Sequence, residues 1–104
     1  MKMELLDGIT ASHKHRAAAD HDQDKEAFYA AYPTFKQPSR WFVIIGGKAY
    51  HTRIIMAAAY SFVHPIAKRL TSTDLNAGAT IARKFTELRF PWKSLDELGN
   101  VPIA

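Results

Sequence analysis

The segment from Trp41 to His51 constrains the fold more than any other part of the chain. Five consecutive residues that favour β-strands, Trp41 to Ile45, precede Gly46-Gly47 and a second short stretch, Lys48 to His51. A Gly-Gly pair suits the two-residue turn in which both central residues need positive φ. The segment is therefore predicted to form a β-hairpin in which Val43 faces Tyr50.

This hairpin is predicted to run directly into the core helix, residues 52–63. Its apolar residues recur at spacings of three and four and so fall on adjacent ridges: Ile54, Ile55, Ala58, Ala59, Phe62 and Val63. Thr52 is the expected N-cap, and Pro65 ends the helix soon after His64.

Two helices are expected before the hairpin. Residues 9–22 form the first, with Thr10 or Ser12 as the cap. Its apolar stripe consists of alanines alone, so shallow packing is predicted. Residues 25–32 form the second, with two aromatic side chains four positions apart on one face.

The last helix is predicted over residues 79–88. Its expected buried stripe is Ile81, Phe85 and Leu88, whereas Arg83, Lys84 and Glu87 are expected to point outward. A capping-box pattern precedes it at residues 71–74. Residues 90–95 are expected to add a short strand, which Pro91 restricts to an edge of the sheet.

Together these elements predict an α+β fold with about four helices packed on a β-hairpin. At 104 residues the chain has room for one hydrophobic core, so a single domain is expected, with its core over residues 9–95 and a tail over 96–104. The absence of cysteine excludes disulfide scaffolds and thiolate sites. No apolar run reaches the ~20 residues of a membrane span, and no signal peptide is visible, so a cytoplasmic location is expected.

Positive charge is concentrated in the middle of the sequence. Between Ala27 and Lys93 lie ten of the 14 Lys and Arg residues but only two of the 10 Asp and Glu residues, within a net charge of +4. A compact positive region attracts polyanions, nucleic acids above all. The alternative is a solvated basic surface that only keeps the protein soluble.

Several basic side chains are candidates for contact with DNA. Arg53 lies in the first turn of the core helix, where its charge opposes the helix dipole and where backbone amides could add anion contacts. The full predicted set is Lys48, Arg53, Lys68, Arg69, Arg83, Lys84 and Lys93. Asn76, Gly78 and Thr80 could hold another phosphate, although a simple bend between helices is the preferred interpretation.

Aromatic residues offer a second kind of contact. Trp41 is expected in the core. Trp92 and Tyr60 could either stack on a base or pack inside, and the sequence leaves both alternatives open.

The sequence lacks a recognisable catalytic or metal-binding pattern. His13 and His15 would lie on nearly opposite sides of a helix, and the five histidines do not form an HNH arrangement. His21 among Asp20, Asp22 and Asp24 is interpreted as a solvated helix end rather than a metal site. No phosphate-binding loop or nucleophile elbow occurs, so no enzymatic activity and no cofactor are expected.

Short motifs also occur in a characteristic order. Tyr50-His51-Thr52-Arg53-Ile54-Ile55 opens the core helix, Thr73-Asp74-Leu75-Asn76-Ala77-Gly78 precedes the last helix, and Leu88-Arg89-Phe90 follows it. This order, over about residues 9–90, resembles the N-terminal head domain of McrA-like, HNH-type restriction endonucleases that recognise methylated or phosphorothioated DNA. The resemblance implies two helices, a hairpin and two further helices.

Three positions depart from the pattern of that family. Ala77 replaces the first glycine of a pair, Arg89 replaces the glycine of Leu-Gly-Phe, and Lys14 stands where an apolar residue is preferred. The resemblance therefore implies a divergent, stand-alone member. Because no HNH part follows in this sequence, it also implies an accessory module rather than the cutting enzyme.

The expected function is non-catalytic binding of double-stranded DNA through the basic surface, with little sequence selectivity. The alternative is a protein-interaction or regulatory module of a restriction or defence system that docks on a nuclease or another defence protein. No membrane partner is expected. The sequence leaves open both the oligomeric state and whether a DNA modification is recognised.

Overall fold

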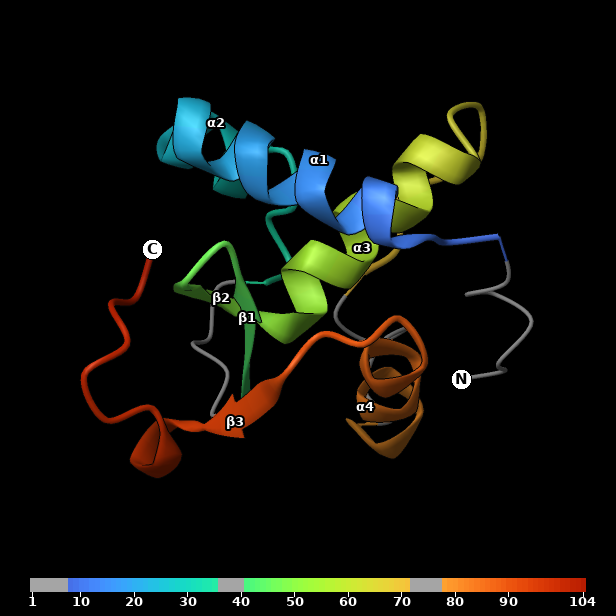
Figure 1. Cartoon of the computed structure of the whole chain (residues 1–104). Coiled ribbons are helices and arrows are strands. Elements are labelled where there is room, and N and C mark those ends of the chain that lie inside the picture. Colours follow the sequence, from blue (N-terminus) through green and yellow to red (C-terminus); the bar gives the residue numbers. More distant parts are fainter. Residues whose placement is uncertain (1–7, 36–40, 72–77) are drawn as a thin grey trace.

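A three-stranded antiparallel sheet, in the order β2-β1-β3, forms one side of the molecule. The computed structural model describes residues 8–35, 41–71 and 78–104 (Figure 1). β1 (Trp41–Ile45) pairs with β2 (Lys48–His51) in the predicted register, with Val43 opposite Tyr50. β3 (Trp92–Ser94) pairs with the other edge of β1, which confirms the expected third strand.

The hairpin turn has the predicted backbone. Gly46 and Gly47 have φ values of 60° and 82°, in the left-handed region that glycine adopts without a steric penalty. The hairpin therefore holds β1 and β2 in one register and delivers the chain to the start of the next helix.

Four α-helices occur in the described part of the chain, so the α+β fold is confirmed. α1 (Ala11–Gln23) and α2 (Lys25–Ala30) precede the sheet. α3 (Thr52–Val63) starts directly after β2, and α4 (Gly78–Glu87) precedes β3. Figure 1 shows α3 between α1 and α4, and α3 also contacts β1 and β2. No helix among the described residues is long and apolar enough to cross a membrane.

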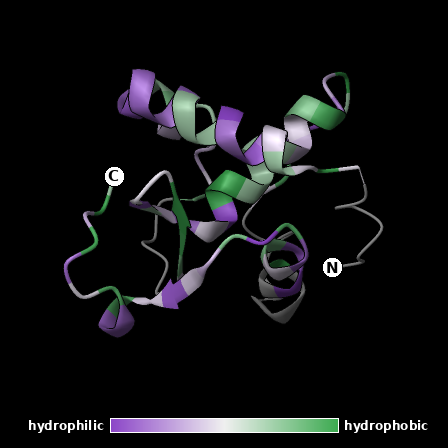
Figure 2. Ribbon diagram, in the orientation of Figure 1, coloured by the Kyte–Doolittle hydropathy of each residue, from purple (hydrophilic) through white to green (hydrophobic). Residues whose placement is uncertain are grey.

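α3 is the core helix, as predicted. Six consecutive residues, Ile54 to Ala59, are each at most 1% exposed, so the helix is buried on all sides there. In Figure 2 the hydrophobic colour marks β1 and part of α3. The N-cap is His51 rather than Thr52, whose hydroxyl instead donates a 3.5 Å hydrogen bond to the carbonyl of Trp41.

α1 packs more deeply than predicted. Its buried residues are Lys14, Ala17, Ala18 and His21, which recur at spacings of three and four along one helix face. The expectation of a shallow, alanine-only stripe is wrong because a lysine and a histidine complete that stripe. The predicted N-cap is correct, since Thr10 precedes the helix and its amide donates to Nδ1 of His13 at 2.9 Å.

The residues expected to form a tail, 96–104, pack on the outer face of the sheet and along the free edge of β2 instead. Leu98 is 5% exposed and packs with Phe42 and Ala49. The Ala49 amide donates to the Pro102 carbonyl at 2.8 Å, and Ala49 accepts from the Ala104 amide at 2.9 Å. A short 3-10 helix, η2 (Leu95–Glu97), begins this segment. The segment packs here because that sheet face is apolar and must be buried.

Candidate nucleic-acid interface

The seven basic residues predicted to contact DNA fall into separate groups. Arg53 lies in the first turn of α3, whereas Lys68 and Arg69 lie beyond its other end. A 12-residue helix spans about 18 Å, so these groups are far apart along α3. The predictions at residues 72–77, including the capping pattern and Asn76, lie outside the described residues.

Lys84 does not point outward, so that prediction is wrong. Its side chain is 6% exposed, and its ammonium lies 3.5 Å from a carboxylate oxygen of Glu87. The cause is helical geometry, because Lys84 falls three and four residues from the buried Ile81 and the half-buried Leu88. Lys84 therefore belongs to the buried stripe of α4, whereas Arg83 beside it is exposed.

Lys48 takes part in a local polar network at the other edge of the sheet. Its ammonium lies 3.5 Å from Oδ2 of Asp22, which also accepts a 2.7 Å hydrogen bond from the Tyr50 hydroxyl. Burial alone would raise the pKa of Asp22, but the hydrogen bonds from Tyr50 and His21, with the charge of Lys48, lower it below its usual value. Lys48 therefore already has a carboxylate partner.

His21 is held within this network by aromatic rings. Its ring packs edge-on at 5.1 Å from the ring of Tyr50 and at 5.4 Å from that of Phe28, and Nδ1 lies 3.2 Å from Oδ1 of Asp22. The interpretation as a solvated helix end is thus wrong for His21, which is 3% exposed. Among the described residues no group of three or more His, Asp or Glu side chains is placed to hold a metal ion.

Lys68 and Arg69 follow α3 in an exposed segment beside a pocket. Arg69 donates a 3.3 Å hydrogen bond to the Ala31 carbonyl, and its guanidinium lies 5.6 Å from the ring centre of Tyr32. Both contacts hold the Arg69 side chain against α2. The side chain of Lys68 is exposed.

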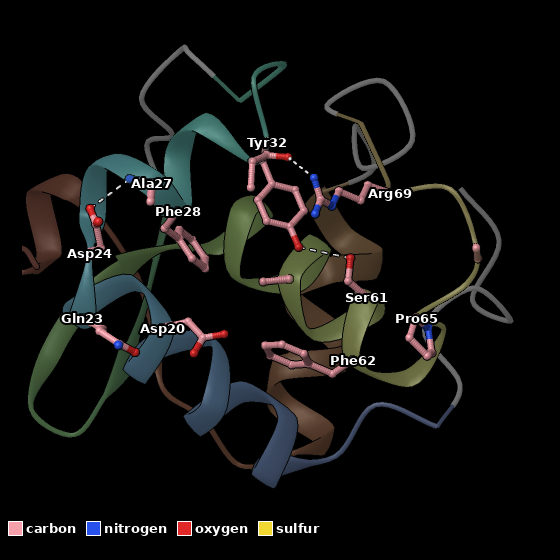
Figure 3. Close-up of a pocket in the computed structure, with 13 residues that line it drawn as sticks. Asp20, Gln23, Asp24, Ala27, Phe28, Tyr32, Ser61, Phe62, Pro65 and Arg69 are labelled. Carbon is pink, nitrogen blue, oxygen red and sulfur yellow. Dashed lines mark hydrogen bonds between the residues drawn. The ribbon is translucent and has the colours of Figure 1, made fainter.

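The pocket has a volume of about 500 Å³ and lies between α1, α2, α3 and the segment after α3. Figure 3 shows the rings of Phe28, Tyr32 and Phe62 along it, with Asp20 directed toward it and Arg69 at one side. Asp24 also lines it, so two carboxylates are set against one guanidinium. This balance of charge disfavours a phosphate ligand.

Two exposed tryptophans form a pair at the end of the sheet. Trp41 is 45% and Trp92 is 38% exposed, and their ring centroids lie 5.0 Å apart with an interplanar angle of 63°. The prediction that Trp41 packs in the core is wrong. Trp41 begins β1 beside the first residue of α3, whereas Val43 and Ile45, further along the strand, are covered by the helices.

Two of the predicted arginines lie close in the chain to a threonine that hydrogen-bonds one of these tryptophans. Arg53 directly follows Thr52, which hydrogen-bonds the Trp41 backbone. The indole NH of Trp92 donates to the hydroxyl of Thr86 at 3.0 Å, and Arg83 lies three residues before Thr86 on the same face of α4. Lys93 is opposite Phe42 in the sheet, so its side chain projects from the face opposite to that of Trp92.

Arg89, three residues before Trp92 in the chain, is a third exposed or half-buried arginine in this part of the structure, and the predicted set did not include it. It follows α4 with φ of 64°, a left-handed conformation, and its side chain is exposed. The amides of Arg89 and Phe90 donate to the carbonyls of Thr86 and Phe85 at 3.0 and 2.9 Å, which is the Schellman arrangement that glycine usually closes. The sequence did contain a signal for Arg89, because an arginine stands there in place of the glycine of the Leu-Gly-Phe motif.

We call Trp41, Trp92, Arg53, Arg83 and Arg89 together the Trp–Arg surface. These residues come from β1, β3, α3, α4 and the turn that follows α4. The ScoMcrA-like N-terminal head domain matches residues 7–91, most of the chain.

The chain belongs to the ScoMcrA-like N-terminal head domain family. The resemblance to McrA-like head domains that the motifs indicated is thereby confirmed. Neither a curated protein nor a solved structure matches the chain. The Leu88-Arg89-Phe90 motif, which lies within the matched residues, is therefore the close of α4 in this head domain.

Proposed function

We propose that this head domain binds double-stranded DNA without catalysing a reaction on it, and that it contacts the DNA backbone through the Trp–Arg surface. The observation that carries the proposal is the exposed tryptophan pair, together with arginines on the elements that hold it. Arg53 follows Thr52, which bonds the Trp41 carbonyl, Arg83 lies one helical turn before Thr86, which bonds Trp92, and the exposed Arg89 lies three residues before Trp92. Arginine beside exposed aromatic surface is typical of nucleic-acid contacts. The net charge of +4 adds a general attraction for DNA.

The conformation of Arg89 supports a role for its side chain. A non-glycine residue in the left-handed region costs roughly 1–2 kcal/mol. Arg89 takes this conformation and is exposed, so contacts inside the protein do not account for an arginine at this position. Residues in such conformations cluster at functional sites, and a phosphate contact would explain the choice of arginine.

The test is a salt series of binding to a labelled duplex. If the three arginines neutralise about three phosphates, log K falls against log salt with a slope near −2.7. Arg53→Glu and Arg83→Glu are each expected to weaken binding and to flatten this slope by about one unit. Lys25→Glu is the matched control, because Lys25 is exposed on α2 and the substitution changes the net charge equally.

Equal losses for Arg53→Glu and Lys25→Glu would show that only net charge matters and would contradict the proposed surface. Binding that is weak and independent of salt would contradict DNA binding altogether. Lys68→Glu in the same series tests the predicted contribution of the segment after α3, and Lys48→Glu and Lys93→Glu test two further lysines of the predicted set. Arg69 and Lys84 are poorer test positions, since both side chains hold intramolecular contacts.

A second function, docking on a nuclease or other defence protein, is favoured by the pocket. Its aromatic lining and two carboxylates, Asp20 and Asp24, suit a cationic side chain of a protein partner better than they suit DNA. The test is capture of such a partner in the presence of added nuclease. Asp20→Lys should abolish capture while Arg53→Glu should not; retention of the partner by Asp20→Lys would count against this function.

A further inference from the structure

Contacts with the DNA backbone do not explain why two tryptophans are exposed side by side. Phosphate recognition requires only cations and amides, yet Trp41 and Trp92 expose 45% and 38% of their surface in one place. Large aromatic side chains usually bury most of their area, because leaving it in water forfeits about 25 cal/mol for each Å². Two of them side by side indicate a surface that receives another flat apolar group.

The geometry of the pair holds the rings ready for such a group. Trp92 is fixed by the 3.0 Å hydrogen bond from its indole NH to Thr86, and by its place in β3. Trp41 meets it at an interplanar angle of 63°, an edge-to-face contact. Both rings remain partly exposed beside this contact, 45% for Trp41 and 38% for Trp92.

The surrounding charges indicate what that group is attached to. Arg83 and Arg89 are exposed on either side of Thr86, the partner of Trp92, in sequence, and the half-buried Arg53 follows Thr52, which bonds the Trp41 carbonyl. The nearest acid in α4, Glu87, is paired with Lys84 at 3.5 Å. A flat apolar group that carries regularly spaced negative charge is a nucleobase on its sugar-phosphate chain.

We infer that Trp41 and Trp92 form a stacking platform for an unpaired nucleobase, so that single-stranded or locally opened DNA is the preferred ligand of the Trp–Arg surface. The inference rests on the proposed function, because it names the kind of DNA that the same surface takes. In an intact duplex the faces of the bases are covered by their neighbours. Only a base that has left the stack can lie on an indole ring.

The chain offers a direct reporter for this inference. Trp41 and Trp92 are its only tryptophans, so its intrinsic tryptophan fluorescence comes from the platform alone. Three probes of equal length separate the contributions: a single strand of thymidines, an abasic deoxyribose-phosphate strand, and a duplex. The first two carry the same phosphates and differ only in the bases.

The thymidine strand is expected to bind about tenfold more tightly than the abasic strand and to quench the fluorescence, since stacking of one base contributes on the order of a factor of ten. Trp92→Leu should remove this preference, whereas Trp92→Phe, which keeps an aromatic face, should retain part of it. Trp41→Leu serves as the second variant if Trp92→Leu unfolds. A loss of preference in Trp92→Phe as large as that in Trp92→Leu would overturn the stacking role.

Equal binding of the thymidine and abasic strands, with duplex binding intact, would overturn the inference and leave the proposed function standing. Failure of all three probes to bind would overturn both. A fluorescence change that follows protein concentration without DNA would also overturn the inference, because the tryptophans would then be a contact between copies of the chain.

Discussion

The side-chain nitrogen of Lys14 lies 2.7 Å from the sulfur of Met56, in the interior where α1 meets α3. Lys14 is fully buried and lies 4.1 Å from the ring centre of Phe85. Burial lowers the pKa of Lys14 well below its usual range, and the neighbouring charge of Lys84 lowers it further. Because thioether sulfur is a weak acceptor, this contact replaces little of the lost hydration, and the amine is stabilised in its neutral form.

Replacing Lys14 with methionine is expected to stabilise the protein. Lys14→Met removes a buried polar nitrogen and leaves an unbranched apolar side chain of similar length against Met56 and Phe85. The expected gain in the free energy of unfolding at neutral pH is roughly 1–3 kcal/mol. Urea denaturation measures it. Lys25→Met, at an exposed position of α2, is the control and should change stability by less than about 0.5 kcal/mol.

The same residue predicts a dependence of stability on pH. In the unfolded chain the pKa of a lysine is about 10.4, so between the lowered folded pKa and that value the unfolded state binds more protons. Stability therefore rises with pH across this window, by at most about 1.4 kcal/mol for each pH unit. Lys14→Met should lack this component of the slope between pH ~7 and pH ~9; equal slopes in the two proteins would mean that Lys14 is charged in the fold.

Arg89→Gly is expected to raise stability and lower DNA affinity at once. The left-handed conformation of Arg89, with φ of 64°, suits glycine, so relief of the steric penalty should add about 1 kcal/mol to the free energy of unfolding. The loss of one exposed guanidinium should weaken duplex binding and flatten the salt slope by about 0.9. Thermal melting and the salt series measure the two effects.

Arg89→Ala is the matched control for this variant. Alanine also lacks the guanidinium but keeps a Cβ in the left-handed region, so DNA binding should fall as in Arg89→Gly without the gain in stability. If Arg89→Gly bound DNA as well as the unmodified protein does, Arg89 would have no part in the interface.

The local elements of this fold could be predicted because their signals are local. The hairpin around Gly46-Gly47 and the helix from Thr52 to Val63 follow from turn chemistry and from apolar spacing, and both occur as predicted. The buried stripe of α1 was missed because Lys14 and His21 are polar residue types, which a hydrophobicity pattern assigns to the surface. Burial of such residues depends on partners from α3, α4 and β2 that only the folded chain supplies.

The candidate site was less predictable for a related reason. Arg53 and Arg83 were identified from charge and position, but the pairing of Trp41 with Trp92, and the bond of Trp92 to α4, depend on how β1, β3 and α4 meet. Trp41 was expected inside because bulky apolar residues of a central strand usually are. Trp41 is exposed because it lies at the end of the strand. Whether a residue at a strand end is covered depends on the neighbouring elements and not on the composition of the strand.

Tyr50→Phe is expected to destabilise the protein at neutral pH. The Tyr50 hydroxyl donates to Asp22 at 2.7 Å and thereby links β2 to the end of α1. The expected loss is about 1 kcal/mol, at the lower end for a bond to a charged group because Asp22 is partly exposed to solvent. Tyr29→Phe is the control, since the Tyr29 hydroxyl makes no hydrogen bond within the described part of the chain.

This loss should depend on pH. The pKa of Asp22 is lowered in the folded protein, so its contribution is present above the unfolded value of about 4 and is lost as pH falls through the folded pKa. Tyr50→Phe and the unmodified protein should therefore differ less at pH ~2 than at pH ~7. A difference that stays constant over this range would mean that the hydroxyl acts through packing and not through the carboxylate.

Arg83 and Lys84 are neighbours on α4 with opposite environments, since Arg83 is exposed whereas Lys84 is buried, with 5% of its surface exposed. Arg83→Ala should reduce the affinity for duplex DNA and flatten the salt slope by about 0.9, with stability unchanged within about 0.5 kcal/mol. Lys84→Ala should do the reverse, since it removes buried contacts with no phosphate contact, and a loss of about 1–3 kcal/mol in the free energy of unfolding is expected. Denaturation and the salt series on both variants separate the two roles. A salt slope that changes in Lys84→Ala as much as in Arg83→Ala would show that Lys84 leaves the interior to meet DNA.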